Sequence, residues 1–361
     1  MNHSFFINLF SILFSLLALS ALGQGSLIDY EHLESTSAQE NTFLFESRMH
    51  RNPRHTYRLL LNTDSLKGKE LVYLYQGHPI LAYKDSAVVA IRDGLSYQPS
   101  YRLDLQLKPI YYAEYGHYDE PFRTQLAIGP RLQFNLRKGF YAVAQWIQPF
   151  QNDFDYRLGL GSRPGEIGVG YTLIRKGNHF FNTYLGTFRN RRYGGYASYI
   201  RMFGNNRMYA GAAIYYTGLY LLDAGTLYAD PINYLTGYVH FTYRLPRYGL
   251  VARVQAEKYL RDDIGGKLTV FRQFGNTDIG FFASKSVAGD NAGFYVTFAL
   301  WPRKFYANRW IQIRPPHSFK LNYDLRPNTG IGEQLRPYTD FYEDILRFNP
   351  DFVRDGLENN R

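Results

Sequence analysis

Residues 122–137 alternate between apolar and polar side chains, and this pattern restricts the possible folds more than any other feature. The even positions are Phe122, Thr124, Leu126, Ile128, Pro130, Leu132, Phe134 and Leu136, and the odd positions are Arg123, Gln125, Ala127, Gly129, Arg131, Gln133, Asn135 and Arg137. Because successive side chains of a β-strand point to opposite faces, the segment predicts a strand with one oily and one wet face. The segment is also longer than the average globular strand of about 5–6 residues.

The same alternation recurs in residues 101–108, 166–173, 207–216, 250–257 and 292–300. Strands of about 9–11 residues are long enough to cross a bilayer at a tilt, and a bilayer admits them only in a closed barrel. The sequence therefore predicts a mainly β protein whose residues 97–301 form a transmembrane antiparallel β-barrel in an outer membrane. A secreted all-β protein is the alternative, because a soluble sandwich also alternates.

About twelve strands are expected in this barrel, and an even number is typical. They are placed at residues 101–115, 121–137, 139–149, 165–175, 179–189, 193–203, 207–217, 233–244, 249–259, 264–274, 278–286 and 292–301.

The segments on either side of this region are of a different kind. Residues 1–23 form an uncharged apolar run ending in Ala-Leu-Gly, which predicts a signal peptide; a membrane anchor is the alternative. Residues 24–96 predict a small α/β module, periplasmic or plug-like, with a short helix at 52–62 and two strands around Gly77. Residues 302–361 predict an irregular C-terminal tail with a short helix within 337–357.

The basic residues are concentrated in the strand region. Lys and Arg outnumber Asp and Glu by nine within residues 97–300, in a chain whose formal net charge is +10. We expect the inward-facing cations and tyrosines to line a polymer path, because aromatic faces stack on sugar rings and basic groups attract carboxylate or phosphate. The candidates are Arg102, Lys108, Arg123, Arg131, Arg201, Arg207, Arg244, Arg253, Lys267, Tyr209, Tyr238 and Tyr295.

A structural role for these cations remains open at this point. They could pair with inward acids such as Asp104, Glu114 and Glu257, or with a plug inside the barrel. Glycines on the inner face are expected to leave room for other side chains or for a passing ligand.

The sequence carries little that indicates catalysis. The chain has no cysteine, which excludes disulfides, thiolate metal sites and a cysteine nucleophile, and its nine histidines are scattered. No Ser/His/Asp set is convincing. We therefore expect no catalytic residue, no metal, no cofactor and no nucleic-acid partner.

Several stretches resemble the YjbH-type exopolysaccharide outer-membrane proteins over roughly residues 41–348. They are "LFESRMHRNPRHTYRLLL", "GPRLQFNLRKGFYAVAQWIQPFQNDFD", "RNRRYGGYASYIRMF" and "DIGGKLTVFRQFGNTDIGFFASKS", the last followed by "GFYVTFAL". This chain has room for one α/β module and one barrel, whereas the long members of the family have more. The resemblance implies a role in extracellular polysaccharide secretion or assembly at the outer membrane, and it implies no catalytic residues.

The expected function is therefore the conduction or handling of an anionic polysaccharide through a basic, tyrosine-rich lumen. The expected partners are outer-membrane lipid, an anionic polysaccharide and periplasmic polymer-export proteins. Two alternatives stay open: a structural or docking barrel of another envelope machine, and a small-solute porin.

Overall fold

The computed structural model describes the strand-forming part of the chain. The described residues are 26–29, 42–46, 70–75, 78–84, 87–90, 101–325 with short gaps, and 334–335. The gaps are 116–121, 137–138, 154–160, 176–177, 190, 204–206, 224–225, 275–276, 299–303, 309 and 317. The predicted signal peptide and both predicted helices lie outside the described residues.

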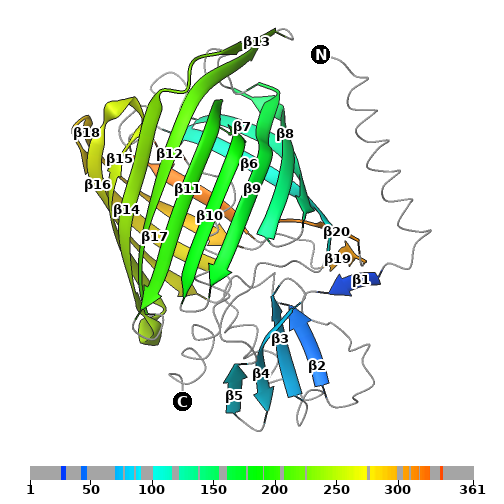
Figure 1. Cartoon of the computed structure of the whole chain (residues 1–361). Helices are drawn as coiled ribbons and strands as arrows, with labels where there is room; N and C mark the ends of the chain where they lie inside the picture. The colour runs from blue at the N-terminus through cyan, green and yellow to red at the C-terminus, as the bar shows by residue number, and fades with distance from the viewer. Residues whose placement is uncertain are drawn as a thin grey trace.

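Twelve long strands form a tilted, curved wall (Figure 1) within a 17-stranded sheet. Their bounds are β6 Leu103–Tyr115, β7 Phe122–Asn135, β8 Phe140–Asn152, β9 Arg163–Arg175, β10 His179–Phe188, β11 Arg192–Phe203, β12 Met208–Asp223, β14 Tyr234–Leu245, β15 Leu250–Lys258, β16 Ile264–Phe274, β17 Thr277–Ser286 and β18 Gly289–Phe298. Each coincides with one of the twelve predicted segments. The short 3-10 helices η4 (Pro246–Tyr248) and η5 (Leu260–Asp262) lie in turns.

Neighbouring long strands pair antiparallel, which satisfies the backbone across the wall. From β9 to β12 and from β14 to β18 the registers run without a shift, whereas β7 and β8 carry bulges. The strand β13 (Thr226–Ala229) folds back onto the end of β12 as a short hairpin. Because a shift of one residue would turn every side chain to the other face, these ladders fix which residues face inward.

Glycine and tyrosine face each other across two of the ladders. Tyr141 on β8 is paired with Gly170 on β9, and Tyr295 on β18 is paired with Gly280 on β17. A Cβ added at either glycine would collide with the ring of its partner. The inner-face glycines at these two positions therefore leave room for tyrosine rings. This agrees with the prediction that such glycines make room for other side chains.

The sheet continues past residue 301, so the prediction of a wholly irregular tail is wrong for residues 304–324. The strand β19 (Lys304–Ala307) pairs with β1 (Ser26–Asp29) and β20 (Ile311–Arg314), and β21 (Phe319–Asp324) pairs antiparallel with β18. The last clear alternation in the sequence ends near residue 301, and these three strands are only 4–6 residues long.

The closed antiparallel barrel is present only in part. The last antiparallel ladder joins β18 to β21, and β20 runs parallel beside β6, so the sheet is not closed by a full antiparallel pair. The chain between β20 and β21 contains Pro315 and Pro316, which lack the N–H needed for a ladder. The short strands and the prolines together limit pairing at this seam.

The two faces of the wall have inverted polarity. Its inward face buries Gln125, Arg131, Thr217, Thr242 and Arg244, whereas large apolar side chains are exposed on the outward face, among them Leu132, Val169, Val239, Val254 and Phe281. In water, this arrangement would expose hydrocarbon and bury polar groups, both at a cost in free energy. In a bilayer the same arrangement is favourable, so the sheet is built to span a membrane.

A second sheet of four strands lies outside the wall (Figure 1). It consists of β2 (Thr42–Glu46), β3 (Glu70–Tyr75), β4 (His78–Lys84) and β5 (Ala87–Ala90). The predicted hairpin around Gly77 is confirmed, since β3 and β4 pair antiparallel, and β2 lies parallel to β3. Among the described residues, no helix is long and apolar enough to cross a membrane.

The inverted faces predict opposite effects for arginine at two neighbouring positions of β15. Val254 lies outward at the centre of the strand and is 60% exposed, whereas Gln255 lies inward and donates to Glu257. We expect Val254→Arg to destabilise the protein by about 2–4 kcal/mol, because the guanidinium enters hydrocarbon. Gln255→Arg keeps a donor for Glu257 and should be tolerated. Urea unfolding in lipid vesicles measures both, and equal losses at the two positions would contradict the membrane assignment.

Candidate functional site: the inner face of the sheet

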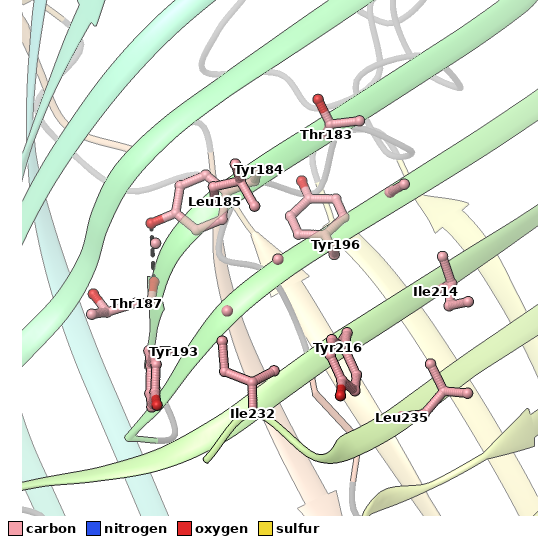
Figure 2. A pocket seen from close by; sticks show the side chains of 14 residues that line it. Thr183, Tyr184, Leu185, Thr187, Tyr193, Tyr196, Ile214, Tyr216, Ile232 and Leu235 are labelled. Atoms are coloured by element: carbon pink, nitrogen blue, oxygen red, sulfur yellow. Dashed lines mark hydrogen bonds between the residues drawn. The ribbon is translucent and has the colours of Figure 1, made fainter. Parts of the chain in front are cut away.

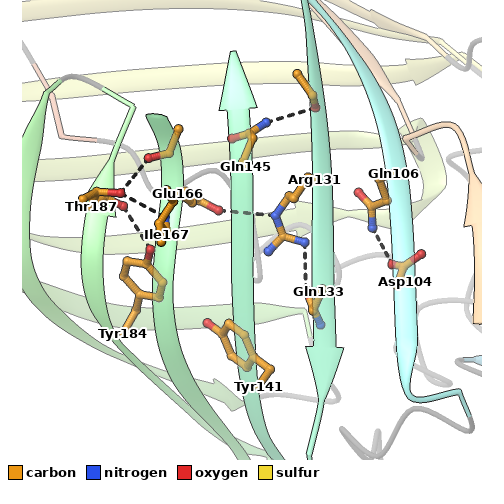
Figure 3. Close-up of polar contacts among 12 residues, drawn as sticks. Asp104, Gln106, Arg131, Gln133, Tyr141, Gln145, Glu166, Ile167, Tyr184 and Thr187 are labelled. Carbon is orange, nitrogen blue, oxygen red and sulfur yellow. Dashed lines mark hydrogen bonds and ion pairs between the residues drawn. The ribbon is translucent and has the colours of Figure 1, made fainter. Parts of the chain in front are cut away.

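Polar side chains fill the inner face on β6 to β9. Arg314 of β20 donates from Nε and Nη2 to the two carboxylate oxygens of Asp104 on β6, at 3.0 and 2.8 Å. The side-chain amide of Gln106 donates to the same carboxylate at 2.7 Å (Figure 3). Asp104 and Arg314 are both buried. This bidentate pair fastens the parallel strand β20 to the wall.

A chain of polar contacts centred on Arg131 continues along the same face (Figure 3). The Arg131 guanidinium contacts the Glu166 carboxylate of β9 at 3.4 Å and donates to the Gln133 amide oxygen at 2.8 Å. Gln133 in turn donates to Asn135 at 2.7 Å, and Asn135 donates to the Tyr101 carbonyl at 3.3 Å. Arg131, 2% exposed, is thus held within a buried network.

Aromatic rings occupy the inner face on β10 to β14. Four tyrosines, which we call the aromatic ladder, stand on successive strands: Tyr184 on β10, Tyr196 on β11, Tyr215 on β12 and Tyr238 on β14. Their ring centroids are separated by 6.0, 5.5 and 6.4 Å in that order. The ring of His240 lies 5.8 Å beyond Tyr238, and that of Phe188 lies 5.5 Å from Tyr184. These spacings are within the range of aromatic contact.

Hydrogen bonds fix some of these rings in place. The Tyr196 hydroxyl accepts from the Asn182 side-chain amide at 2.6 Å, and the Tyr184 hydroxyl donates to the Thr187 carbonyl at 3.0 Å. Tyr141 on β8 donates to the Asn182 amide oxygen at 3.4 Å. The aromatic ladder is therefore a preorganised surface.

Cations also contact aromatic rings on the inner face from β12 to β21. The Arg244 guanidinium donates to the Tyr209 hydroxyl at 2.5 Å, and both side chains are buried. The Lys267 ammonium lies 4.2 Å from the centre of the Phe282 ring, and the Lys320 ammonium lies 3.8 Å from that of Tyr295. These separations are within the range of a cation–π interaction.

The predicted inward orientation is confirmed for most of the described candidates. The side chains of Lys108, Arg131, Arg244, Tyr209 and Tyr295 are buried on the inner face, and those of Arg253, Lys267 and Tyr238 are half-buried there. The side chain of Arg123 lies outside the described residues.

The inward prediction is wrong for Arg201, and Tyr199 lies on the same face of the strand. Both are exposed on the outward face of β11, whereas Arg192 and Tyr196 are buried on the inner face. At the start of this strand, Tyr193, Gly194 and Gly195 show no clear alternation of apolar and polar side chains. The sequence therefore assigns the odd-numbered residues of β11 to the wrong face. The Tyr199 hydroxyl is hydrogen-bonded to His179 Nδ1 at 2.6 Å near the strand ends, a position typical of a membrane interface.

Arg102 and Arg207 lie outside the ladders that fix the inner face. Both are exposed just outside the strands β6 and β12. The Arg102 guanidinium lies over the Trp310 ring at 4.4 Å. Each residue lies one position before its strand begins. There, an odd or even residue number no longer indicates the face to which a side chain points.

Sequence reasoning missed several inward cations, among them Arg314, Lys320 and Arg192. Arg314 and Lys320 lie in the segment expected to be irregular, and Arg192 precedes the expected start of its strand. Arg192 is buried, contacts Thr217 at 3.4 Å and lies over the Tyr234 ring at 4.6 Å. The alternation of Lys320, Asn322 and Asp324 with Leu321 and Tyr323 was the available signal for β21.

A shallow apolar groove lies on the outward face over β10 to β14. Figure 2 shows Leu185, Ile214, Tyr216, Ile232 and Leu235 around it. Gly195, which is paired with Leu185, adds no side chain to the floor of this groove. Its lining is suited to hydrocarbon chains of lipid.

No group of three or more His, Asp or Glu side chains that could hold a metal ion occurs in the part of the chain that the structure describes.

No family model matches the chain, and no curated protein matches it. Among solved structures, it is similar to a loop L8 deletion mutant of OmpT, an outer membrane protein of Vibrio cholerae, at 7% identity with a TM-score of 0.29. That similarity covers 62% of this chain and 92% of the other. It is also similar to Salmonella typhi OmpF in complex with daunomycin, at 9% identity with a TM-score of 0.31, over 64% of this chain and 100% of the other. The membrane assignment depends on the burial pattern of the sheet itself.

The buried contact between Arg131 and Glu166 predicts asymmetric costs of substitution. Arg131→Gln leaves the Glu166 carboxylate buried without this cation and should destabilise the protein by about 3–5 kcal/mol. The double variant Arg131→Gln/Glu166→Gln removes both charges and should recover most of that loss. A double-mutant cycle from urea unfolding measures the difference; additive costs would contradict a direct interaction.

Proposed function

We propose that this protein is an outer-membrane β-barrel that conducts or handles an anionic exopolysaccharide. The observation that carries the proposal is the interleaving of cations and aromatic rings on the inner face of β14 to β21. There, Arg253 and Lys267 are half-buried, and Lys320 is exposed beside Tyr295. Such a surface offers ring faces for sugars and positive charge for acidic substituents.

Support for the outer-membrane location comes from how the sheet is built. Its long antiparallel strands bury polar groups inward and expose apolar groups outward. By the strand bounds, the connections at one end span two to four residues, as at 176–178, 204–207 and 275–276, whereas those at the opposite end reach ten residues, as at 153–162. Short turns are typical of the periplasmic end of such barrels. The predicted signal peptide accords with this location.

The pairing of charges supports a proposed polymer path along one part of the inner face. Arg131 contacts Glu166, and Arg314 contacts Asp104, so these cations stabilise the β6 to β9 wall. This supports a structural role for part of the cation set, which the sequence had left open. The path then follows the wall from β14 to β21, where the basic groups are more exposed.

The proposed mechanism needs no catalytic residue, cofactor or metal. A positive potential along the path would raise the local concentration of an acidic polymer, and tyrosine rings would stack on successive sugars. Charges separated by more than about 8–10 Å are screened in physiological salt, so several cations must act together. The four-stranded sheet β2–β5 is proposed to contact periplasmic polymer-export proteins.

The test replaces Arg253, Lys267 and Lys320 together by glutamine, which removes the charge and retains polarity. Secretion of polymer by the producing strain should fall at least about tenfold, because the potential along the path depends on their sum. Assembly is checked by heat-modifiable migration of the barrel on a gel.

A matched control replaces Arg201, Arg207 and Arg247 by glutamine, three exposed cations outside the inner wall. This variant should secrete normally. Normal secretion by a correctly assembled inner-face variant would refute the conduit proposal and favour a docking barrel. Equal losses in both variants would assign the effect to overall charge.

A further inference from the structure

Two consecutive residues of the C-terminal segment lie inside the wall. Leu335 is 5% exposed and belongs to a core cluster whose other members all face inward from β8, β10, β11 and β12. These members are Tyr141, Val143, Tyr184, Phe188, Tyr196, Ala213 and Tyr215, with Tyr238 packed against them. Leu335 therefore packs against the lumen side of the aromatic ladder.

Its neighbour Gln334 is held by a different strand. The Gln334 side-chain amide donates to the Glu257 carboxylate of β15 at 2.5 Å. Glu257 is buried on the inner face and is directly opposite Tyr238 in the β14–β15 ladder. Residues 334–335 thus contact inward side chains from β8 to β15, so they lie across a broad sector of the inner wall.

The chemistry of the occupied site differs from that of an ordinary apolar core. Five tyrosines surround a single leucine, and several of their hydroxyls are already hydrogen-bonded to Asn182 or to backbone. The Leu335 side chain packs against the tyrosine rings but cannot form a hydrogen bond. A pyranose ring has an apolar C–H face and hydroxyls at its edge. Its C–H face can stack on the tyrosine rings, and its hydroxyls can form hydrogen bonds with the polar groups beside them.

We infer that this tyrosine-lined site binds a sugar ring of the transported polymer, and that Gln334–Leu335 is its internal competitor, which closes the lumen until displaced. The sugar half of this inference rests on the proposed function; the closure half does not. Leu335 covers the ring faces with a single aliphatic side chain, so a polymer that stacks on several rings can replace it.

The closure is tested by ion conductance of the full-length protein in planar bilayers. Gln334→Ala/Leu335→Ala removes both contacts and should raise the open probability about tenfold or more, since burial of one leucine contributes a factor of this order. Leu325→Ala is the matched control, because Leu325 is a leucine of the same C-terminal region but is 62% exposed. It should leave conductance unchanged. Unchanged conductance in a correctly assembled double variant would overturn the closure.

The absence of cysteine from the chain allows a second test of closure. Gln334→Cys/Glu257→Cys places two thiols at the ends of the observed contact. A short thiol-reactive cross-linker should join the two cysteines in the folded barrel. The cross-link should lower the conductance of this variant to that of the protein without substitutions. Failure to cross-link in the folded barrel would place residue 334 outside the lumen and overturn the inference.

The sugar site is tested with a neutral gluco-oligosaccharide added to the opened Gln334→Ala/Leu335→Ala channel. The oligosaccharide should block the current, and the further change Tyr215→Leu should weaken the block about tenfold or more, as expected for loss of a ring face. Higher conductance without such a block would overturn the assignment of the ladder as a sugar site. These measurements use purified protein without polymer export, so their outcome is separate from loss of secretion in the inner-cation variant.

Discussion

Backbone hydrogen bonding in a medium without water is the constraint on which the rest of this structure depends. A strand that crosses hydrocarbon must pair every N–H and C=O with a neighbour, and the long ladders from β6 to β18 do this. Their fixed registers then divide the side chains between two surroundings. The exposed leucines, valines and phenylalanines and the buried arginines and glutamines are two consequences of the same pairing.

The inner face is not a uniform charged tube. On β6 to β9, buried cations meet carboxylates and amides, and the resulting network holds the strands together. On β10 to β14, tyrosines are fixed by packing and by hydrogen bonds. From β15 to β21, Lys267 and Lys320 lie near aromatic rings in a more open setting. One sector of the wall therefore stabilises the sheet, and we propose a different sector for ligand handling.

The seam beside β6 shows how local sequence limits the closure of the sheet. Strand β20 is short and parallel to β6, yet the Arg314–Asp104 pair holds it there. The prolines that follow β20 prevent a longer ladder. A charged pair therefore supports a region where backbone pairing is incomplete, and replacing either partner would leave a buried charge behind.

The alternation of residue types by itself determined the strand positions, the spanning character of the sheet and the inward side of most strands. It succeeded for β7, β12 and β15 because period-two patterning follows directly from strand geometry. It failed for Arg201, where glycines and tyrosines weaken the contrast between faces, and for Arg102 and Arg207, which lie just beyond their strands.

Only the tertiary structure decided which inward groups meet one another. Glu166 is 35 residues from Arg131, Arg314 is 210 residues from Asp104, and Gln334 is 77 residues from Glu257. No local pattern records such distances, because the curvature of the sheet and the course of the C-terminal segment bring these groups together. Periodicity sets the face on which a side chain lies, whereas its partner depends on how the whole wall curves.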